Sequence, residues 1–548
     1  MPTVEFSIGD LSALLGKKVS AGELEDALLY AKGELESVEG EMVKADIKDT
    51  NRPDLWSVEG IARELRGHYG LETGVPRFKV ASSGISLKVS RGVEGVRPKT
   101  VAAAVKGLEL NDYAIRQIIQ LQEKIHQTYG QKRSSVAVGI YDLDRVKPPV
   151  SYTSVKPDGI KFVPLDSERE MTPAEILEKH PKGIEYRHLL KGFKEYPLMI
   201  DSGGNVLSIP PIINSSYTGK VTPETRNVFI ELTGHELERL SIALNVVVTA
   251  LAERGGSIYS VDVIYPSEEI TTPDLTPQKF RIDKKYCNRT LGLELGQREI
   301  IALLKKARYD AAAQGNRVEL RYSAYRNDIM HQRDVVEDIA IAYGVNRIKP
   351  EPPKIATVGS VNRGEEFADA VRELMVGLGF QEILTFSLTD KNNLFRKMEL
   401  EEGKVCEIAN PVSISWSVLR NWLMPSMLEF LTHNLHVEYP HRIFEVGDVV
   451  EIDEKAETKT RVIKKLACVV TNNVVTYEEI SSALDAVFRN LGIDYNLKKG
   501  SHSSFVFGRA SRVFTGKKEL GVMGEIHPQV LNNWKLEKPA VGFEIELP

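Results

Sequence analysis

The sequence predicts an α+β protein built from several domains. Its 548 residues correspond to three or four domains of ordinary size. Apolar residues make up 42% and charged residues 27%, which is typical of folded globular proteins and excludes disordered and fibrous classes. Segments with the periodicity of strands alternate with segments with the periodicity of helices, and proline-rich stretches divide them.

The first predicted domain covers residues 1–75 and includes a helix that we expect to begin at Pro53. Apolar side chains recur from there with helical spacing, and proline is favoured in the first turn of a helix. Gly74-Val75-Pro76 ends the segment. Arg52 and Trp56 lie at the corner before the helix, where exposure is unfavourable, so we expect them in a contact between domains or subunits.

The second predicted domain, residues 90–262, mixes strands with two long helices. We expect the helices at Asn111–Tyr129 and Glu236–Glu253 and strands at YPLMID and NVFIEL. The proline-rich stretch from Tyr265 to Pro277 closes this domain, because proline is excluded from helix interiors and central strands.

The third predicted domain, residues 270–347, is winged-helix-like. A short helix within residues 296–307 is followed by a hairpin that turns at Gln314-Gly315-Asn316. Such units bind nucleic acid in some proteins, but nearby acids balance the basic side chains here. Docking of another protein is therefore the favoured interpretation, and nucleic-acid binding is the alternative.

Four carboxylates are concentrated near the end of this domain. Asp334, Glu337 and Asp338 have the spacing that places them on one helix face, and Asp328 lies on the incoming loop. An oxygen-rich set without sulfur suits a hard cation such as Mg²⁺. The alternative needs no metal: Asp334 would be the N-cap, Glu337 its capping-box partner, and both acids would complement the helix dipole. Spacing alone leaves both interpretations open.

Charge and cysteine content narrow the function classes. With a net charge of -5, nucleic-acid contact requires a local basic patch. The three cysteines lie far apart without a CxxC pattern, which argues against a disulfide framework or a zinc site and fits a reducing compartment. The first residues lack a secretion-signal pattern and no apolar run reaches the length of a membrane span, so we expect a cytoplasmic protein.

Several stretches, in the same order along nearly the whole chain, resemble the β subunit of phenylalanyl-tRNA synthetase of the archaeal and eukaryotic type. They are NRPDLWSVEGIAREL, YPLMIDSGGNVLSIPPIINS, YRNDIMHQRDVVEDIAIAYG, ANPVSISWSVLRNWLMPSMLEFLTHN, RIFEVGDVV and GVMGEIHPQVL. Each stretch alone is a weak signal, whereas their common order is specific.

The resemblance implies a heterotetramer of two α and two β subunits that uses ATP to charge tRNA(Phe) with phenylalanine. The aminoacylation site, with its ATP, belongs to the α subunit. Asp328, Asp334, Glu337 and Asp338 match the family positions that hold a magnesium ion shared with the α subunit.

Residues 360–548 follow the proline-rich boundary Lys349–Pro353 and resemble a class II synthetase fold that has lost its catalytic motifs. Arg442–Glu445 matches a strand that binds ATP and amino acid in active copies, but the glycine-rich, arginine-containing motif that should follow is missing. We therefore expect a non-catalytic antiparallel-sheet domain that pairs with the α subunit. Trp416 and Trp422 are available for its core or interface.

The middle block resembles the family's tRNA-editing domain, which hydrolyses mischarged Tyr-tRNA(Phe). A pocket for an apolar ring rejects an analogue with an added hydroxyl by only about 100-fold, so a second site that recognises the hydroxyl is needed. By resemblance, Met199, Ser208 and Asn214 fall on editing-pocket positions. From the residues alone, a buried strand and turn is the favoured interpretation of PPIIN. The isolated His180 and His188 indicate no catalytic group, which stays unknown.

Two other functions compete with this interpretation. A free-standing aminoacyl-tRNA trans-editing hydrolase would act without a partner, and the long C-terminal domain argues against it. A nucleic-acid-binding regulator built on the winged-helix-like segment would bind DNA or RNA without chemistry, and the net charge of -5 counts against it.

Overall fold

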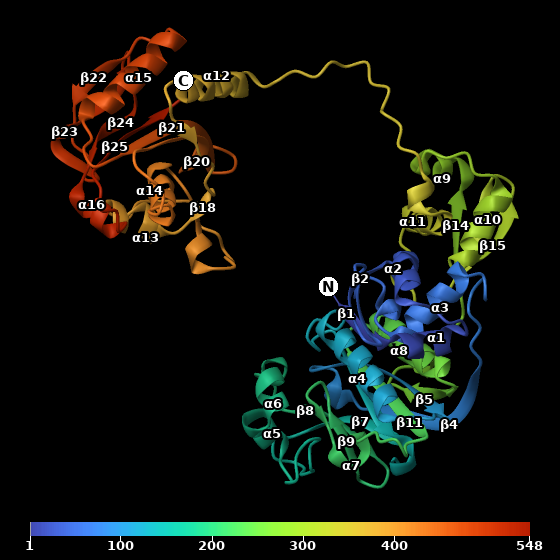
Figure 1. The fold of residues 1–548 in the computed structure, drawn as a ribbon. Helices are drawn as coiled ribbons and strands as arrows, with labels where there is room; N and C mark the ends of the chain where they lie inside the picture. Colours follow the sequence, from blue (N-terminus) through green and yellow to red (C-terminus); the bar gives the residue numbers. More distant parts are fainter. Residues whose placement is uncertain (1, 548) are drawn as a thin grey trace. The chain divides into compact units, whose positions relative to one another are not determined.

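The computed structural model describes residues 2–547 and divides the chain into two compact units, Met1–Pro352 and Pro353–Pro548 (Figure 1). Several sheets with helices packed against them confirm the predicted multidomain α and β class. None of the described helices is long and apolar enough to cross a lipid bilayer.

A three-stranded antiparallel sheet in the order β1-β3-β2 begins the first unit. Its elements are β1 (Thr3–Ser7), α1 (Ile8–Leu15), α2 (Ala21–Tyr30), β2 (Gly33–Glu39), β3 (Met42–Ile47) and α3 (Val58–His68). The prediction that a helix begins at Pro53 was wrong, because Pro53–Leu55 form only a 3-10 turn. Helix α3 begins at Val58, where the Ser57 hydroxyl caps it by accepting the Gly60 N–H.

A ten-stranded sheet occupies the centre of the first unit. Its order is β10-β9-β8-β7-β4-β12-β5-β11-β6, with β13 paired to β12. The strands are β4 (Val80–Val89), β5 (Lys99–Lys106), β6 (Val136–Asp142), β7 (Val150–Val155), β8 (Tyr196–Asp201), β9 (Val206–Ile209), β10 (Ile213–Asn214), β11 (Asn227–Gly234), β12 (Ser257–Ile264) and β13 (Glu269–Thr272).

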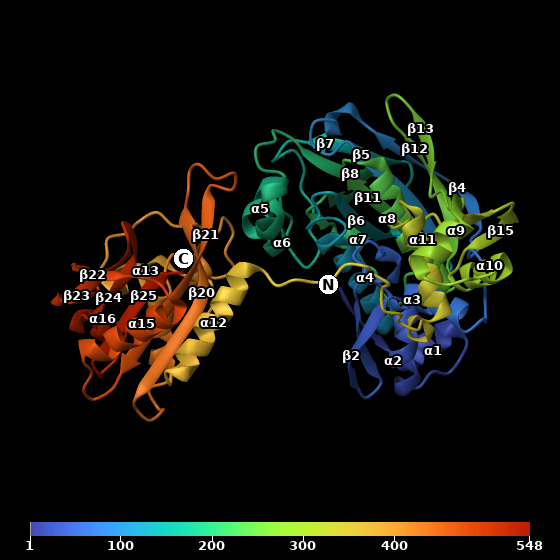
Figure 2. The same cartoon turned by 90° about the horizontal axis from the view of Figure 1, so that it is seen from above.

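Two long helices, α4 (Asp112–Gln127) and α8 (Leu237–Glu253), pack side by side against this sheet (Figures 1 and 2). Both confirm predicted helices, and the Asn111 side chain caps α4 by accepting the Ala114 N–H. The helices share a core with Val101, Ala103 and Val105 of β5, whose alternate residues pack on the opposite face of the sheet. The shorter helices of this region are α5 (Pro173–Lys179), α6 (Pro181–Tyr186) and α7 (Ser216–Gly219).

The last part of the first unit contains the predicted helix and hairpin. Its elements are β14 (Gln278–Asp283), α9 (Lys284–Leu291), α10 (Gln297–Lys306), β15 (Asp310–Gln314), β16 (Arg317–Tyr322) and α11 (Gln332–Tyr343). The sheet has the order β14-β16-β15, and its hairpin turns at Gly315, whose φ of 58° favours glycine.

The second unit contains a seven-stranded sheet in the order β17-β20-β21-β25-β24-β23-β22. All neighbouring strands are antiparallel except β17 and β20. Helices α12 and α15 share one core cluster with the sheet, and α14 shares another. The elements are α12 (Arg363–Gly377), β17 (Gln381–Glu382), β18 (Leu388–Thr389), α13 (Lys391–Leu394), β19 (Val418–Leu419), α14 (Met424–His433), β20 (His441–Ile452), β21 (Thr460–Thr471), α15 (Tyr477–Leu491), β22 (Asn496–Lys499), β23 (Phe505–Thr515), β24 (Lys518–Ile526), α16 (Pro528–Asn533) and β25 (Ala540–Glu546).

Candidate functional site

A cavity of about 390 Å³ lies in the ten-stranded sheet domain, between α4, β6 and the loop that joins β9 to β10. Its lining combines an apolar wall with polar and charged side chains, and concave sites of this kind bind small molecules. The apolar wall includes Ile115, Ile118, Ile140, Pro210, Pro211, Ile212 and Ile213. The polar side chains in the lining include Ser208, Asn214 and Glu231.

Glu231 is a buried carboxyl without a cationic partner. The Tyr141 hydroxyl lies 2.8 Å from Glu231 Oε1 and 2.8 Å from Ser208 Oγ. Because a phenol has one proton, it can donate to only one of these oxygens at a time. Burial raises the pKa of Glu231 to about 7, against the opposing effect of the Tyr141 hydrogen bond. The second oxygen, Oε2, is buried and has no hydrogen-bond partner within residues 2–547, which is unusual for a buried polar atom.

Asn214 is held at the end of the sheet by a close glycine contact. A Cβ added at Gly219 would lie 2.5 Å from Asn214 Cβ, so only glycine lets α7 approach this closely. The Asn214 amide nitrogen lies 3.4 Å from the Ile140 carbonyl oxygen, to which it donates a long hydrogen bond.

Arg133 fixes the Pro210–Pro211 wall. Gln131, Lys132 and Arg133 have φ values of 50°, 53° and 68°, a run in the left-handed region that ordinary residues rarely adopt. From there the buried guanidinium donates to the carbonyls of Pro211 and Ile212 at 3.3 and 2.8 Å. The unusual backbone therefore places a cation under the loop that forms the cavity wall.

His126 lines the cavity but is occupied by the protein. Its Nε2 accepts the Val138 N–H at 2.8 Å, and its Nδ1 lies 3.3 Å from Glu123. Burial lowers the pKa of His126, whereas the hydrogen bond from His126 lowers the pKa of Glu123 to about 2. With one nitrogen accepting a backbone proton and the other facing a carboxylate, His126 is not available as a general base.

The three residues predicted for the pocket are adjacent, but only two line it. Met199 pairs with Ser208 across β8 and β9, and Ser208 pairs with Asn214 across β9 and β10. Met199 is fully buried in a hydrophobic cluster and is not part of the lining, so its predicted contact with a ligand stays a prediction. Glu231 also lines the cavity and was not predicted, although a charged residue inside the apolar strand NVFIEL is a visible signal in the sequence.

Comparisons with known proteins agree along the whole chain. Family models match residues 85–254 (B3/4 domain), 280–345 (tRNA synthetase B5 domain) and 348–547 (phenylalanyl tRNA synthetase beta chain CLM domain). The phenylalanine–tRNA ligase beta subunit of Pyrococcus abyssi is 50% identical over 551 residues, which covers 100% of this chain and 99% of the relative. The Methanocaldococcus jannaschii subunit is 43% identical, with 100% of both chains covered.

The chain belongs to the phenylalanine–tRNA ligase β-subunit family. A crystal structure of an N-terminal fragment of the Pyrococcus horikoshii β subunit agrees with this, at 50% identity and a TM-score of 0.61. The match covers 63% of this chain and 100% of the fragment. As a phenylalanine–tRNA ligase β subunit, the chain is part of an aminoacyl-tRNA synthetase and acts in protein biosynthesis.

In this β subunit, cations already neutralise the two buried carboxylates predicted for magnesium. Arg326 bonds both oxygens of Asp328, at 2.6 and 2.5 Å, and reaches Asp338 at 2.7 Å. Lys32 of the N-terminal domain lies 3.2 Å from Asp338, and Arg52 lies 3.9 Å from Asp328. Burial would raise the pKa of Asp338, but Arg326 and Lys32 outweigh it and hold that pKa below its ordinary value.

The other two predicted ligands, Asp334 and Glu337, have different surroundings. Asp334 accepts the N–H groups of Met330 and His331 at 2.8 and 2.6 Å, and Glu337 is 56% exposed beside Lys32. The predicted capping box was wrong in register, because His331 is the N-cap of α11 and Asp334 is its partner. Among residues 2–547 no group of three or more His, Cys, Asp or Glu side chains is arranged to hold a metal. These residues by themselves therefore do not fit Mg²⁺, and a site completed by another chain stays a prediction.

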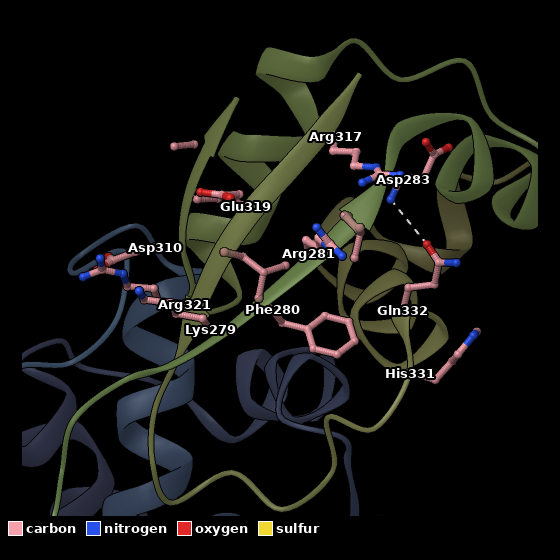
Figure 3. Close-up of a pocket in the computed structure, with 14 residues that line it drawn as sticks. Lys279, Phe280, Arg281, Asp283, Asp310, Arg317, Glu319, Arg321, His331 and Gln332 are labelled. Atoms are coloured by element: carbon pink, nitrogen blue, oxygen red, sulfur yellow. Dashed lines mark hydrogen bonds between the residues drawn. The ribbon is translucent and has the colours of Figure 1, made fainter. Parts of the chain in front are cut away.

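A second hollow, of about 950 Å³, lies on the exposed face of the β14-β16-β15 sheet (Figure 3). Cations and acids are mixed there, because the strand register sets Arg281 opposite Glu319 and Arg317 opposite Asp283. Such a face lacks the continuous basic stripe that phosphate backbones require. Its mixed charge favours the predicted protein docking over nucleic-acid binding.

In the second unit, the glutamate of the degenerate strand is part of the fold. Glu445 is fully buried and pairs with Arg420 at 2.8 Å, while the Thr385 hydroxyl donates to it at 2.6 Å. Trp422 is buried in the core beneath α14, and Trp416 is 41% exposed. With its partners inside the chain, Glu445 is not free to bind an amino acid or a nucleotide.

Proposed function

We propose that this chain is the non-catalytic partner in a cytoplasmic α₂β₂ phenylalanine–tRNA ligase and that its 390 Å³ cavity hydrolyses mischarged Tyr-tRNA(Phe). In this proposal ATP and the aminoacylation step belong to the α subunit, and Mg²⁺ is shared between the two subunits. One observation carries the editing role: an apolar cavity of suitable size contains a buried carboxyl with one unpartnered oxygen.

Glu231 would distinguish tyrosine from phenylalanine. The phenol hydroxyl can form a hydrogen bond with Oε2 whether the carboxyl is protonated or not, because a phenol both donates and accepts. Phenylalanine leaves that buried oxygen unpartnered. A site built to bond a hydroxyl disfavours the analogue without it by about 10⁴ to 10⁵ in known enzymes.

Hydrolysis would proceed through a positioned water. With the phenol at Glu231, the ester lies toward Asn214, whose amide can orient water or the ester oxygen. Water attacks the ester carbonyl, the bond to the terminal ribose breaks, and the ribose oxygen takes up a proton as tyrosine leaves. Since His126 is occupied, the neighbouring ribose hydroxyl is the group that relays the proton.

The editing proposal is tested with the purified α and β complex and Asn214→Ala. We expect the variant to clear Tyr-tRNA(Phe) about 10²- to 10³-fold more slowly, the usual effect of removing one positioned donor. Phenylalanine charging should be unchanged, because its site lies on the α subunit. Unaltered clearance of tyrosine would remove Asn214 from the site, and a wild-type complex without clearance would overturn the editing role.

An exposed apolar surface on the second unit supports pairing with the α subunit. Isolated exposed apolar residues are common, whereas a group of large ones marks a binding surface. Two of its members, Phe386 and Trp416, contact edge-to-face with ring centroids 5.4 Å apart. Its members, with their exposed fractions, are Leu384 (90%), Phe386 (75%), Val412 (105%), Ile414 (86%) and Trp416 (41%).

Replacing both aromatic residues, Phe386→Ser with Trp416→Ser, should weaken assembly by about 2 kcal/mol or more, as expected for aromatic anchors of an interface. Native mass spectrometry across a dilution series measures dissociation of the complex of α and β subunits. Phe507→Ser is the matched control, because Phe507 is 86% exposed outside this surface. If both variants assemble equally well, this surface is not the interface with the α subunit. If the wild-type chain hydrolyses Tyr-tRNA(Phe) without a partner, the alternative function of a free-standing hydrolase is favoured.

A further inference from the structure

Two charged side chains at the cavity have no side-chain partner among residues 2–547. Glu123 is paired with Arg133 at 3.1 Å, and Lys182 is paired with Glu185 at 3.0 Å. By contrast, neither Asp166 nor Lys220 takes part in a described side-chain hydrogen bond or ion pair, although both line the cavity and are exposed. Nothing in the proposed recognition of the phenol or the ester uses Asp166.

The turn that carries Asp166 is attached to the strand that carries Asn214. The Leu165 N–H donates to the Asn214 carbonyl at 2.9 Å, and the Leu165 carbonyl lies 3.1 Å from His180 Nε2. The Ser167 N–H closes the turn on the Pro164 carbonyl at 3.1 Å. Leu165 is therefore fixed on both sides, which places Asp166 beside the end of the sheet where the ester would lie.

The backbone of Asp166 is in an uncommon conformation. Its φ is 63°, in the left-handed region, which aspartate and asparagine tolerate better than other residues with side chains. His180, one of the isolated histidines, maintains this turn: its Nδ1 accepts the Lys182 N–H while Nε2 faces the Leu165 carbonyl. The carboxylate at the cavity is thus positioned by contacts outside the turn.

We propose that Asp166 binds the α-ammonium group of the aminoacyl ester. This inference rests on the proposed editing function. A tyrosyl ester presents one cation, the ammonium group next to the ester carbonyl, while the tRNA around it presents anionic phosphates. A carboxylate at the mouth of the cavity attracts the first and repels the second. Asp166 would then orient the ester over Asn214 while Glu231 holds the phenol.

The test compares two esters on the purified complex: Tyr-tRNA(Phe) and its counterpart without the amino group, 3-(4-hydroxyphenyl)propanoyl-tRNA(Phe). Each rate is divided by the spontaneous hydrolysis rate of the same ester, because the ammonium group itself activates the ester. The variant is Asp166→Asn, since asparagine tolerates the same backbone. The control is Glu168→Gln, an exposed acid two residues away that is not part of the cavity lining.

We expect Asp166→Asn to lower kcat/KM for Tyr-tRNA(Phe) by about 10- to 100-fold, the range for losing a hydrogen bond to a charged group. Hydrolysis of the ester without the amino group should be equal in variant and wild type, and Glu168→Gln should match wild type on both. An equal loss on both esters, or no loss, would overturn the role of Asp166. A wild-type complex that hydrolyses neither ester would overturn the editing function itself. Melting temperatures of the variants equal to that of the wild type exclude a folding defect.

Discussion

The first unit buries carboxyls in two opposite electrostatic settings, one occupied by Glu231 and the other by Asp328 and Asp338. Glu231 lies among apolar side chains with a tyrosine hydroxyl as its neighbour, and burial raises its pKa to about 7. Asp328 and Asp338 lie among Arg326, Arg52 and Lys32, which keep the pKa of Asp338 below its ordinary value. The same chemical group is thus available to a ligand in the first setting and is a structural counter-ion in the second.

The largest expected effect comes from removing the cation of the second group. Arg326→Ala should lower the free energy of unfolding of the first unit by about 3–5 kcal/mol, because two carboxylates would stay buried without their shared partner. Urea unfolding measures the change. Arg321→Ala is the control, since Arg321 is exposed and takes part in no described ion pair, and we expect a change within about 0.5 kcal/mol. Similar losses in both variants would contradict the structural role of the group.

Because their pKa values are shifted in opposite directions, Glu231 and Asp338 should contribute to folding stability with opposite pH dependences. Glu231 has a folded pKa of about 7 against 4.5 unfolded, so its contribution to stability falls as the pH rises from 4.5 to 7. Over that window the wild type should lose about 3 kcal/mol relative to Glu231→Gln, which cannot titrate. Asp338 has a lowered pKa, so its contribution is present at neutral pH and is lost on acidification. Parallel stability curves for wild type and Glu231→Gln would contradict a raised pKa.

The smallest effect concerns the hydroxyl that Glu231 would recognise. Glu231→Leu removes the hydrogen bond with little change in volume. We expect kcat/KM for Tyr-tRNA(Phe) to fall about 10- to 100-fold, which corresponds to a loss of about 1.5–3 kcal/mol of transition-state stabilisation. Glu231→Gln keeps a polar group there and should retain most of the activity. Deacylation of Tyr-tRNA(Phe) and Phe-tRNA(Phe) by both variants measures the effect. If Leu and Gln act alike, Glu231 does not read the hydroxyl.

Much of the fold could be predicted from local patterns, and the network of contacts could not. The helix over Asn111–Tyr129 was visible because its cap and its apolar spacing are adjacent in sequence, and Gly315 marked the hairpin. The start of α3 was missed because Pro53 offers an equally good local signal and only the Ser57 cap decides between them.

In the candidate site, too, local sequence predicts some residues, whereas contacts between distant parts of the chain determine the others. Resemblance to a family selected Ser208 and Asn214, but Glu231 gains its meaning from Tyr141, which is 90 residues away in sequence. The spacing of Asp334, Glu337 and Asp338 correctly put them on one helix. It could not reveal that Lys32 of another domain lies beside Glu337 and Asp338. Local spacing describes a helix face, whereas the charge state of a carboxyl depends on what packs against it.

The segment between the two units gives the chain a point of access for proteases. Residues 350–361 have no helix or strand and are exposed throughout, and separate hydrophobic clusters lie on either side of them. Each fragment left by a cut there would keep its own hydrophobic core. We therefore expect limited proteolysis to yield two folded polypeptides, one with the cavity and one with the apolar surface.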